Sequence, residues 1–309
     1  MKQTILGICL LAVMLLAAAC SAQPAAQTPL SDTAIPAFDH IFVLVLENRS
    51  FTDVIGSPHM PRFNALAKEN TLLTQYTGVT HPSLPNYIAM VSGDTQGIEK
   101  DCKDCFVNAE TLAERLEAAG RAWKTYQEDM PEPCFLGDAG EYVQKHNPFV
   151  YFDAVRMDAQ RCAENVVPLT MLDTDLASGS LPNFSLIVPN MCNNGHDCAS
   201  AVADEWIVGM VDRLRQAPAV QQSRYLIVVT YDESSSPKGV SGFVRRVTGR
   251  ATERIATVLI SPDAQPGFED ATAYNHYSLL KTILLAWDLP ALGHTADDTV
   301  SAIRAPWKP

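Results

Sequence analysis

The chain has 309 residues, 47% of them hydrophobic, and a formal net charge of −12 at pH 7. This length and composition are sufficient for one large α/β domain with a substantial core. The acidic balance argues against a general nucleic-acid-binding surface, because negative charge repels the phosphate backbone.

The first 19 residues are typical of a secretory signal peptide. Lys2 is followed by a short apolar run over Thr4–Ala19, which ends in small residues directly before Cys20. Such a run is too short for an ordinary membrane span. The cysteine after small residues resembles a bacterial lipobox, so we expect Cys20 to be lipidated; the alternative is an ordinary signal peptide with a chance cysteine. Cleavage would leave 22 basic and 35 acidic residues, a formal charge of −13.

Residues 20–37 are expected to form a lipidated, flexible tether, because Ala, Pro, Gln, Ser and Thr give this stretch little to bury. Residues 38–309 contain neither an internal repeat nor an obvious linker, and we expect one domain there. An exported protein of this kind would sit on the outer face of a bacterial membrane or be secreted.

Short apolar runs alternate with helical patterns along this domain, which predicts an α/β sandwich with a mostly parallel sheet. The predicted strands are His40–Leu46, Phe184–Val188, Tyr225–Thr230 and Ala256–Ile260. The predicted helices are Ala109–Ala119, Asp204–Gln216 and Tyr277–Trp287.

Polar residues follow three of the predicted strands: Glu47-Asn48, Asp232-Glu233 and the segment from Asn190 to Asp197. In parallel α/β sheets, sites form beyond the carboxyl ends of the strands. Carboxylate and amide oxygens suit divalent cations, so we expect Glu47, Asn48, Asp232 and Glu233 to bind a metal ion of unspecified identity. The alternative is ordinary solvated loop polarity.

Ser83 precedes an apolar stretch that ends at Gly93, and it is expected at or near the start of a helix. A serine there can attack phosphorus as a metal-stabilised alkoxide, with the first N–H groups of the helix close to the anion. The alternative is a simple N-cap.

Histidines can contact a phosphoryl group or protonate a leaving oxygen. We favour His196, which lies beside Asp197 on a loop after a predicted strand, and also consider His146 and His276. We interpret the remaining histidines as surface or structural residues. These are His40, His59, His81 and His294.

Six cysteines follow Cys20, an even number that suggests disulfides in an exported protein. Cys192 with Cys198 is the favoured local pair, and Cys102 with Cys105 is a second candidate. Cys134 and Cys162 complete the set. A zinc site is disfavoured because the CxxC at Cys102 has no second CxxC.

Seven motifs in this order resemble the bacterial phosphoesterase family of acid phosphatases and phospholipase C enzymes, within the alkaline phosphatase superfamily. They are Glu47–Phe51, Thr80–Tyr87, Trp123–Pro131, His146–Phe149, Pro189–Asp197, Thr230–Glu233 and His276–Leu280. The resemblance covers about residues 38–290 and is strongest to small secreted acid phosphatases, including those acting on phosphoinositides. It implies a three-layer alkaline-phosphatase-like sandwich.

The resemblance also implies residue roles. Glu47, Asn48, Asp232 and Glu233 would hold the metal, with Ser83 as nucleophile and further ligand. His146, His196 and His276 would act on the phosphoryl or leaving group, and Asn86 and Asp197 would bind substrate. Tyr87 stands where sulfatases carry arginine, which argues against a sulfatase. Ser234–Gly239 departs from the glycine-rich acidic stretch of many relatives, which bears on the metal shell.

These features together predict metal-dependent hydrolysis of phosphate monoesters through a phosphoserine. The alternatives are a phospholipase C-type phosphodiesterase and a lipoprotein that binds a metal or an anion without turnover. The expected partners are a phosphorylated small molecule or lipid and a membrane reached through the lipid anchor, with no nucleic acid.

Overall fold

The computed structural model describes residues 34–235 and 254–308, which belong to a compact unit that begins at Asp32. The expected signal peptide, the expected lipidation site Cys20 and most of the expected tether lie outside the described residues, as do residues 236–253. Across the ranges described, no helix combines the length and apolar character needed to cross a bilayer.

The predicted α/β architecture is confirmed by an eight-stranded sheet with the order β5-β4-β6-β1-β7-β8-β2-β9. The five strands from β5 to β7 run parallel, and β8 is antiparallel to both of its neighbours. The strands are β1 (His40–Leu46), β2 (Thr71–Leu73), β4 (Trp123–Gln127), β5 (Val166–Pro168), β6 (Phe184–Val188), β7 (Tyr225–Tyr231), β8 (Thr257–Ile260) and β9 (Glu269–Asp270). A separate parallel pair joins β3 (Tyr76–Thr77) and β10 (Tyr274–Asn275).

The central position of β1 follows from its composition. All of its residues except His40 are buried, as expected for an apolar strand covered on both faces. It pairs in parallel with β6 on one side and β7 on the other, in a register that sets Leu46 beside Tyr231. The residues that follow β1 and β7 therefore emerge next to each other.

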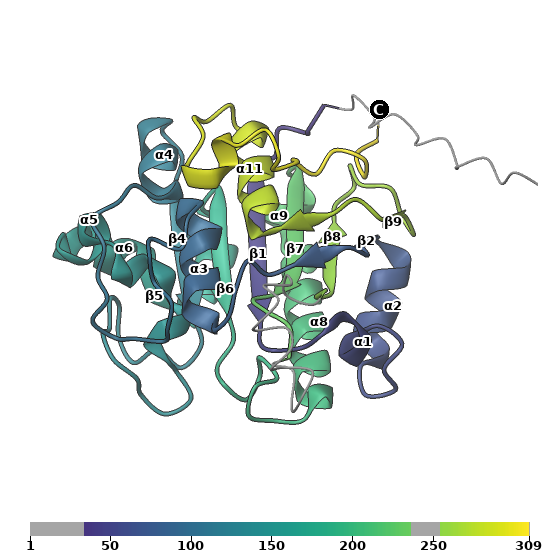
Figure 1. Ribbon diagram of the computed structural model, residues 1–309, viewed down its shortest axis with the longest axis horizontal. Helices are drawn as coiled ribbons and strands as arrows, with labels where there is room; N and C mark the ends of the chain where they lie inside the picture. The colour runs from purple at the N-terminus through teal and green to yellow at the C-terminus, as the bar shows by residue number, and fades with distance from the viewer. Residues whose placement is uncertain (1–33, 236–253, 309) are drawn as a thin grey trace, which may run out of the picture. The chain divides into compact units, whose positions relative to one another are not determined.

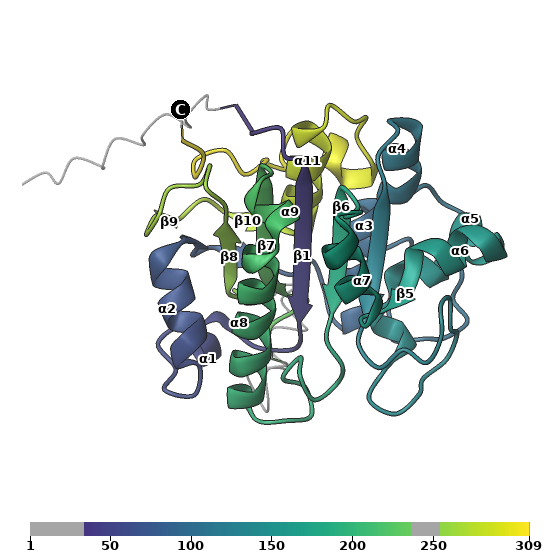
Figure 2. The ribbon, with the colours of Figure 1, turned by 180° about the vertical axis from the view of Figure 1, so that it is seen from behind.

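Helices cover both faces of the sheet, which makes the three layers that were expected. Helices α3 (Ser83–Ser92) and α11 (His276–Ala286) lie in front of the sheet in Figure 1. Figure 2 shows the opposite face covered by α7 (Met171–Ser178), α8 (Ser200–Gln216) and α9 (Pro218–Gln221). The other helices of residues 34–235 and 254–308 are α1 (Phe51–Val54), α2 (Pro61–Glu69), α4 (Leu112–Ala118), α5 (Asp153–Arg156), α6 (Ala159–Asn165), and the 3-10 turns η1 (Gln144–His146), η2 (Pro148–Tyr151) and η3 (Gly293–Ala296).

Helix boundaries differ from the predicted ones where capping decides them. The helix expected from Ala109 begins at Leu112, because Thr111 is its N-cap: the Thr111 hydroxyl accepts from Ala113 N, and Glu114 accepts from Thr111 N. Strand β4 was missed as a strand because Lys124 and the terminal Gln127 interrupt its apolar pattern.

Helix α3 ends at Gly93, whose φ of 74° favours glycine. A Cβ at this position would lie 2.2 Å from the Leu292 carbonyl oxygen, so only glycine permits the close approach. His294 N also donates to Gly93 O at 2.8 Å. The end of α3 is therefore fixed against the segment after α11.

The six cysteines that follow Cys20 form three disulfides, and both the favoured local pair and the second candidate pair are confirmed. Cys102 bonds Cys105, and Cys192 bonds Cys198. The third bridge joins Cys134 to Cys162, 28 positions apart in the chain.

Candidate active site

Two adjacent strand ends bring three acidic residues together. Glu47 and Asn48 follow β1, and Asp232 and Glu233 follow β7. Asp232 N donates to Leu46 O at 2.9 Å, which extends the parallel ladder by one residue. Asn48 adopts a left-handed φ of 52° and donates its backbone N–H to Asp232 Oδ1 at 3.1 Å.

Ser83 is the first residue of α3 and its side chain is buried against this acidic cluster. Its Oγ lies 3.0 Å from Glu47 Oε2 and 3.5 Å from Glu233 Oε1. The single hydroxyl proton can be given to only one carboxylate at a time. Ser83 therefore lies between Glu47 and Glu233.

The second oxygen of Glu47 is held by two further side chains. Tyr87 donates its hydroxyl to Glu47 Oε1 at 2.8 Å, and His146 Nε2 lies 3.1 Å from the same oxygen. Ser83 and Tyr87 are four residues apart on α3, so they share one face of the helix. That spacing was the available sequence signal for Tyr87, which sequence reasoning used only to argue against a sulfatase.

Burial and mutual repulsion set the charge state of the cluster. Burial alone would raise the pKa of Glu47, but His146 and then Lys145 keep the pKa of this carboxyl below its usual value. Burial, then the charges of Glu47 and Glu233, raises the pKa of Asp232 well above its usual value. Burial also raises the pKa of Glu233, although the His81 imidazole opposes this shift. The three buried carboxylates therefore repel one another, which opposes their being ionised all at once.

The donor chemistry of the cluster fits a divalent cation. Asp232 Oδ2 is buried without a hydrogen-bond partner, which is costly for a carboxylate oxygen. Three carboxylates and the Asn48 amide supply hard oxygen donors. Within residues 34–235 and 254–308, however, no three His, Cys, Asp or Glu side chains already surround one point in a metal-binding arrangement. Several of these oxygens are instead engaged by Ser83, Tyr87, His81 and His146.

His81 is the principal residue that sequence reasoning set aside. Its Nδ1 pairs with Glu233 Oε2, and 34% of its side chain is exposed at the edge of the cluster. The signal that could have found it is its place two residues before Ser83 on the same turn. Glu233 therefore connects the serine hydroxyl on one oxygen with an imidazole on the other.

His276 does not occupy the position expected for a phosphoryl contact. It is fully buried behind Asp232, with Nε2 2.5 Å from the Asp232 carbonyl oxygen and Nδ1 3.2 Å from Tyr76 OH. Because a carbonyl only accepts, Nε2 carries the proton and Nδ1 accepts from Tyr76. Burial lowers the pKa of His276 to about 4, so the ring stays neutral and supports the Asp232 backbone.

Asn86 also differs from the expected substrate contact. Its Oδ1 accepts from Val79 N and Thr80 N, and its Nδ2 donates to Thr80 O and Pro82 O. These bonds use both amide protons, so Asn86 braces the turn that leads to Ser83.

The loop from Asn190 to Asp197 reaches the cluster through its backbone. Asn194 O accepts from Glu47 N at 3.1 Å. His196 Nδ1 pairs with Asp197 Oδ1 at 2.6 Å, with 34% and 56% of these side chains exposed. His196 and Asp197 are thus paired with each other at the surface, while His146 contacts the cluster directly.

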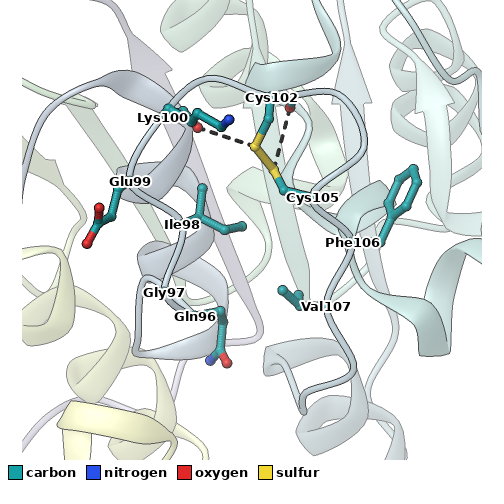
Figure 3. A pocket seen from close by; sticks show the side chains of 9 residues that line it. All are labelled: Gln96, Gly97, Ile98, Glu99, Lys100, Cys102, Cys105, Phe106 and Val107. Carbon is teal, nitrogen blue, oxygen red and sulfur yellow. Dashed lines mark hydrogen bonds between the residues drawn. A yellow bond between two sulfur atoms is a disulfide. The ribbon is translucent and has the colours of Figure 1, made fainter.

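A cavity of about 570 Å³ lies apart from these residues (Figure 3). It is lined by the segment from Gln96 to Val107, including the Cys102–Cys105 disulfide. None of the lining residues belongs to the acidic cluster at the strand ends.

The sequence is similar to several phosphatases. It is 34% identical over 292 residues to an acid phosphatase of Aspergillus fumigatus, covering 89% of this chain and 60% of that protein. It is 33% identical to a phosphate-repressible acid phosphatase of Penicillium chrysogenum, covering 86% and 63%. A phosphatidylinositol-3-phosphatase of Mycobacterium tuberculosis is 31% identical, with 93% and 89% covered. The chain thus spans less than two thirds of the two fungal relatives.

Solved structures confirm the fold. An alkaline phosphatase superfamily protein from Vibrio parahaemolyticus aligns with a TM-score of 0.57 at 14% identity, over 84% of this chain and 69% of that chain. A phosphonate monoester hydrolase from Silicibacter pomeroyi gives the same TM-score at 12% identity, over 86% and 76%. Residues 57–290, most of the domain just described, match the Phosphoesterase family model, and the chain belongs to that family.

Proposed function

We propose that this protein hydrolyses phosphate monoesters through a phosphoserine intermediate at Ser83. The observation that carries the proposal is the buried Ser83 hydroxyl, 3.0 Å from Glu47 Oε2 and 3.5 Å from Glu233 Oε1 at the start of α3. A serine acting only as an N-cap needs no such carboxylates. The acid phosphatases among its relatives support the same reaction class.

A divalent cation is proposed to bind Glu47, Asn48, Asp232 and Glu233, with Ser83 as a further ligand. Such a cation would neutralise the buried negative charge and stabilise the attacking serine oxygen. The support is the mutual repulsion of the three buried carboxylates and the unpartnered Asp232 Oδ2.

The chain's own groups define where the protons move. As Ser83 Oγ forms its bond to phosphorus, its hydroxyl proton passes to Glu233 Oε1, which lies 3.5 Å away and whose other oxygen pairs with His81. The bond from phosphorus to the leaving oxygen breaks, and that oxygen takes a proton from His81. Water then attacks the phosphoserine and gives its proton to His81, and Glu233 returns its proton to Oγ. Glu47 orients the serine and is itself fixed by Tyr87 and His146.

The natural substrate is proposed to be a phosphorylated small molecule or a phosphoinositide, in keeping with the mycobacterial relative. Three disulfides indicate an exported protein, because such bonds persist in oxidising compartments. Lipidation at Cys20 would hold the enzyme beside lipid substrates.

The test is hydrolysis of p-nitrophenyl phosphate by the purified protein and its Ser83→Ala variant, before and after chelation. We expect turnover that the chelator abolishes and one divalent metal restores, and a loss of at least about 10³-fold in Ser83→Ala. Bis(p-nitrophenyl) phosphate separates the two ester classes, and faster diester turnover would identify the phosphodiesterase alternative. Metal binding without turnover would identify a binding protein, and substantial activity in a folded Ser83→Ala variant would remove Ser83 as nucleophile.

A further inference from the structure

One carboxylate close to Ser83 is not part of the acidic cluster. Asp101 Oδ1 accepts from Leu84 N at 3.1 Å, the backbone N–H directly after the nucleophile. Its Oδ2 lies 2.9 Å from Lys145 Nζ. Asp101 therefore joins the first turn of α3 to the 3-10 turn η1, which also carries His146.

Lys145 is the cation of this arrangement. The Lys145 side chain is 22% exposed, and burial would lower the pKa of Lys145, but Asp101, Glu47 and Asp232 together raise it. The ammonium therefore stays charged close to the carboxylates around Ser83. It has a fixed position, which a substrate-binding cation needs if it is to meet one oxygen of a phosphoryl group.

We propose that the phosphoryl group of the substrate binds between Leu84 N–H and Lys145 Nζ, and that the Asp101 carboxylate is an internal anion which the substrate displaces from this position. This inference rests on the proposed function, since it concerns the same nucleophile. Lys145 is then a substrate-binding residue, and Asp101 competes with the substrate.

Two observations support displacement rather than a permanent bond. The Asp101 side chain is 33% exposed, so it can turn into water without burying an unpaired charge. The two donors it occupies, a helix N-terminal N–H and an ammonium, are the kinds of group that bind phosphate oxygens. Leaving Asp101 in place would also set a fourth carboxylate against an incoming phosphate dianion.

The experiment uses isothermal titration calorimetry to measure the binding of inorganic phosphate to the purified protein. Every variant is measured in the same divalent-cation buffer. Lys145→Met is expected to weaken phosphate binding about 10- to 100-fold, and Lys145→Arg to restore most of it. Asp101→Asn is expected to tighten binding, because the competing charge is gone. Lys100→Met and Asp104→Asn remove the same charges from exposed positions near Asp101 and serve as matched controls.

Unchanged phosphate affinity in a folded Lys145→Met variant would overturn the proposal. So would weaker binding in Asp101→Asn, which would show that Asp101 only positions Lys145. The titration needs no turnover, so it remains informative if the Ser83 mechanism fails. If turnover is present, KM should follow the same order across the variants, with a smaller change in kcat.

Discussion

Protonation of His276 is expected to make the fold sensitive to acid. In the folded protein its pKa is about 4, against 6.5 for the ordinary side chain. The unfolded chain therefore binds more protons than the native state between these two values, so stability falls as the pH falls through that window. Because one pKa unit corresponds to about 1.4 kcal/mol, this single ring removes about 3 kcal/mol of unfolding free energy between pH 7 and pH 4, and about 2 kcal/mol by pH 5.

The assay is urea unfolding at pH 7, 5 and 4, comparing the natural protein with His276→Gln. The glutamine amide can still donate to the Asp232 carbonyl but does not titrate, so the carboxylate contributions common to both proteins cancel in the difference. We expect the variant to start less stable at pH 7, because Tyr76 OH loses its acceptor, and to lose about 3 kcal/mol less on acidification. Parallel loss of stability in both proteins would refute the assignment of a neutral, buried His276.

Three further changes test other parts of the structure. Gly78→Ala would set a Cβ 2.8 Å from the Asp232 carbonyl oxygen. We therefore expect kcat/KM to fall at least about tenfold and the free energy of unfolding to fall by about 1–3 kcal/mol. The control is Gly209→Ala, which has open space around it and should leave activity unchanged. Tyr87→Phe removes a buried hydrogen bond that helps to keep the pKa of Glu47 low, so the acid limb of the pH–rate profile should move to higher pH. Urea unfolding should show a loss of about 1.5–3 kcal/mol of stability. An unshifted acid limb would contradict this role of Tyr87. Replacing both cysteines of the Cys134–Cys162 bridge by serine should lower the free energy of unfolding by about 3–4 kcal/mol. The same change at the Cys102–Cys105 bridge should cost less, because that bridge closes a loop of only four residues. The reverse order in thermal unfolding would contradict the dependence on loop length.

The strand ends could be predicted because parallel neighbours in a sheet end at one edge. Glu47 and Asp232 each follow an apolar run, and the carboxyl ends of parallel strands lie at the same edge of a sheet. The alternation of strands and helices was therefore enough to place both residues at that edge. The position of Ser83 also follows locally, since helix α3 starts where its apolar stretch starts.

The direction in which a side chain points was harder to predict. His276 begins a helix beside the site, but its ring turns inward to the Asp232 carbonyl, and nothing in its neighbouring residues indicates this. Asn86 lies one turn from Ser83 and is used entirely by its own loop. His81, in contrast, was interpreted as a surface or structural residue but contacts the site. Its contact is a pairing with Glu233, which is remote in the sequence.

The close contact of Gly93 with Leu292 also affects how Ser83 is held. Helix α3 has Ser83 at one end and Gly93 at the other, so a support at Leu292 limits how far the serine can tilt or slide relative to Glu47. Leu292 and the following Gly293 lie beyond residues 57–290, the part that matches the family. The alignment of the Ser83 hydroxyl therefore depends on a late stretch of chain that contributes no side chain to the acidic cluster. Shortening or loosening that stretch would act on catalysis through the angle of a helix, even with every residue around Ser83 intact.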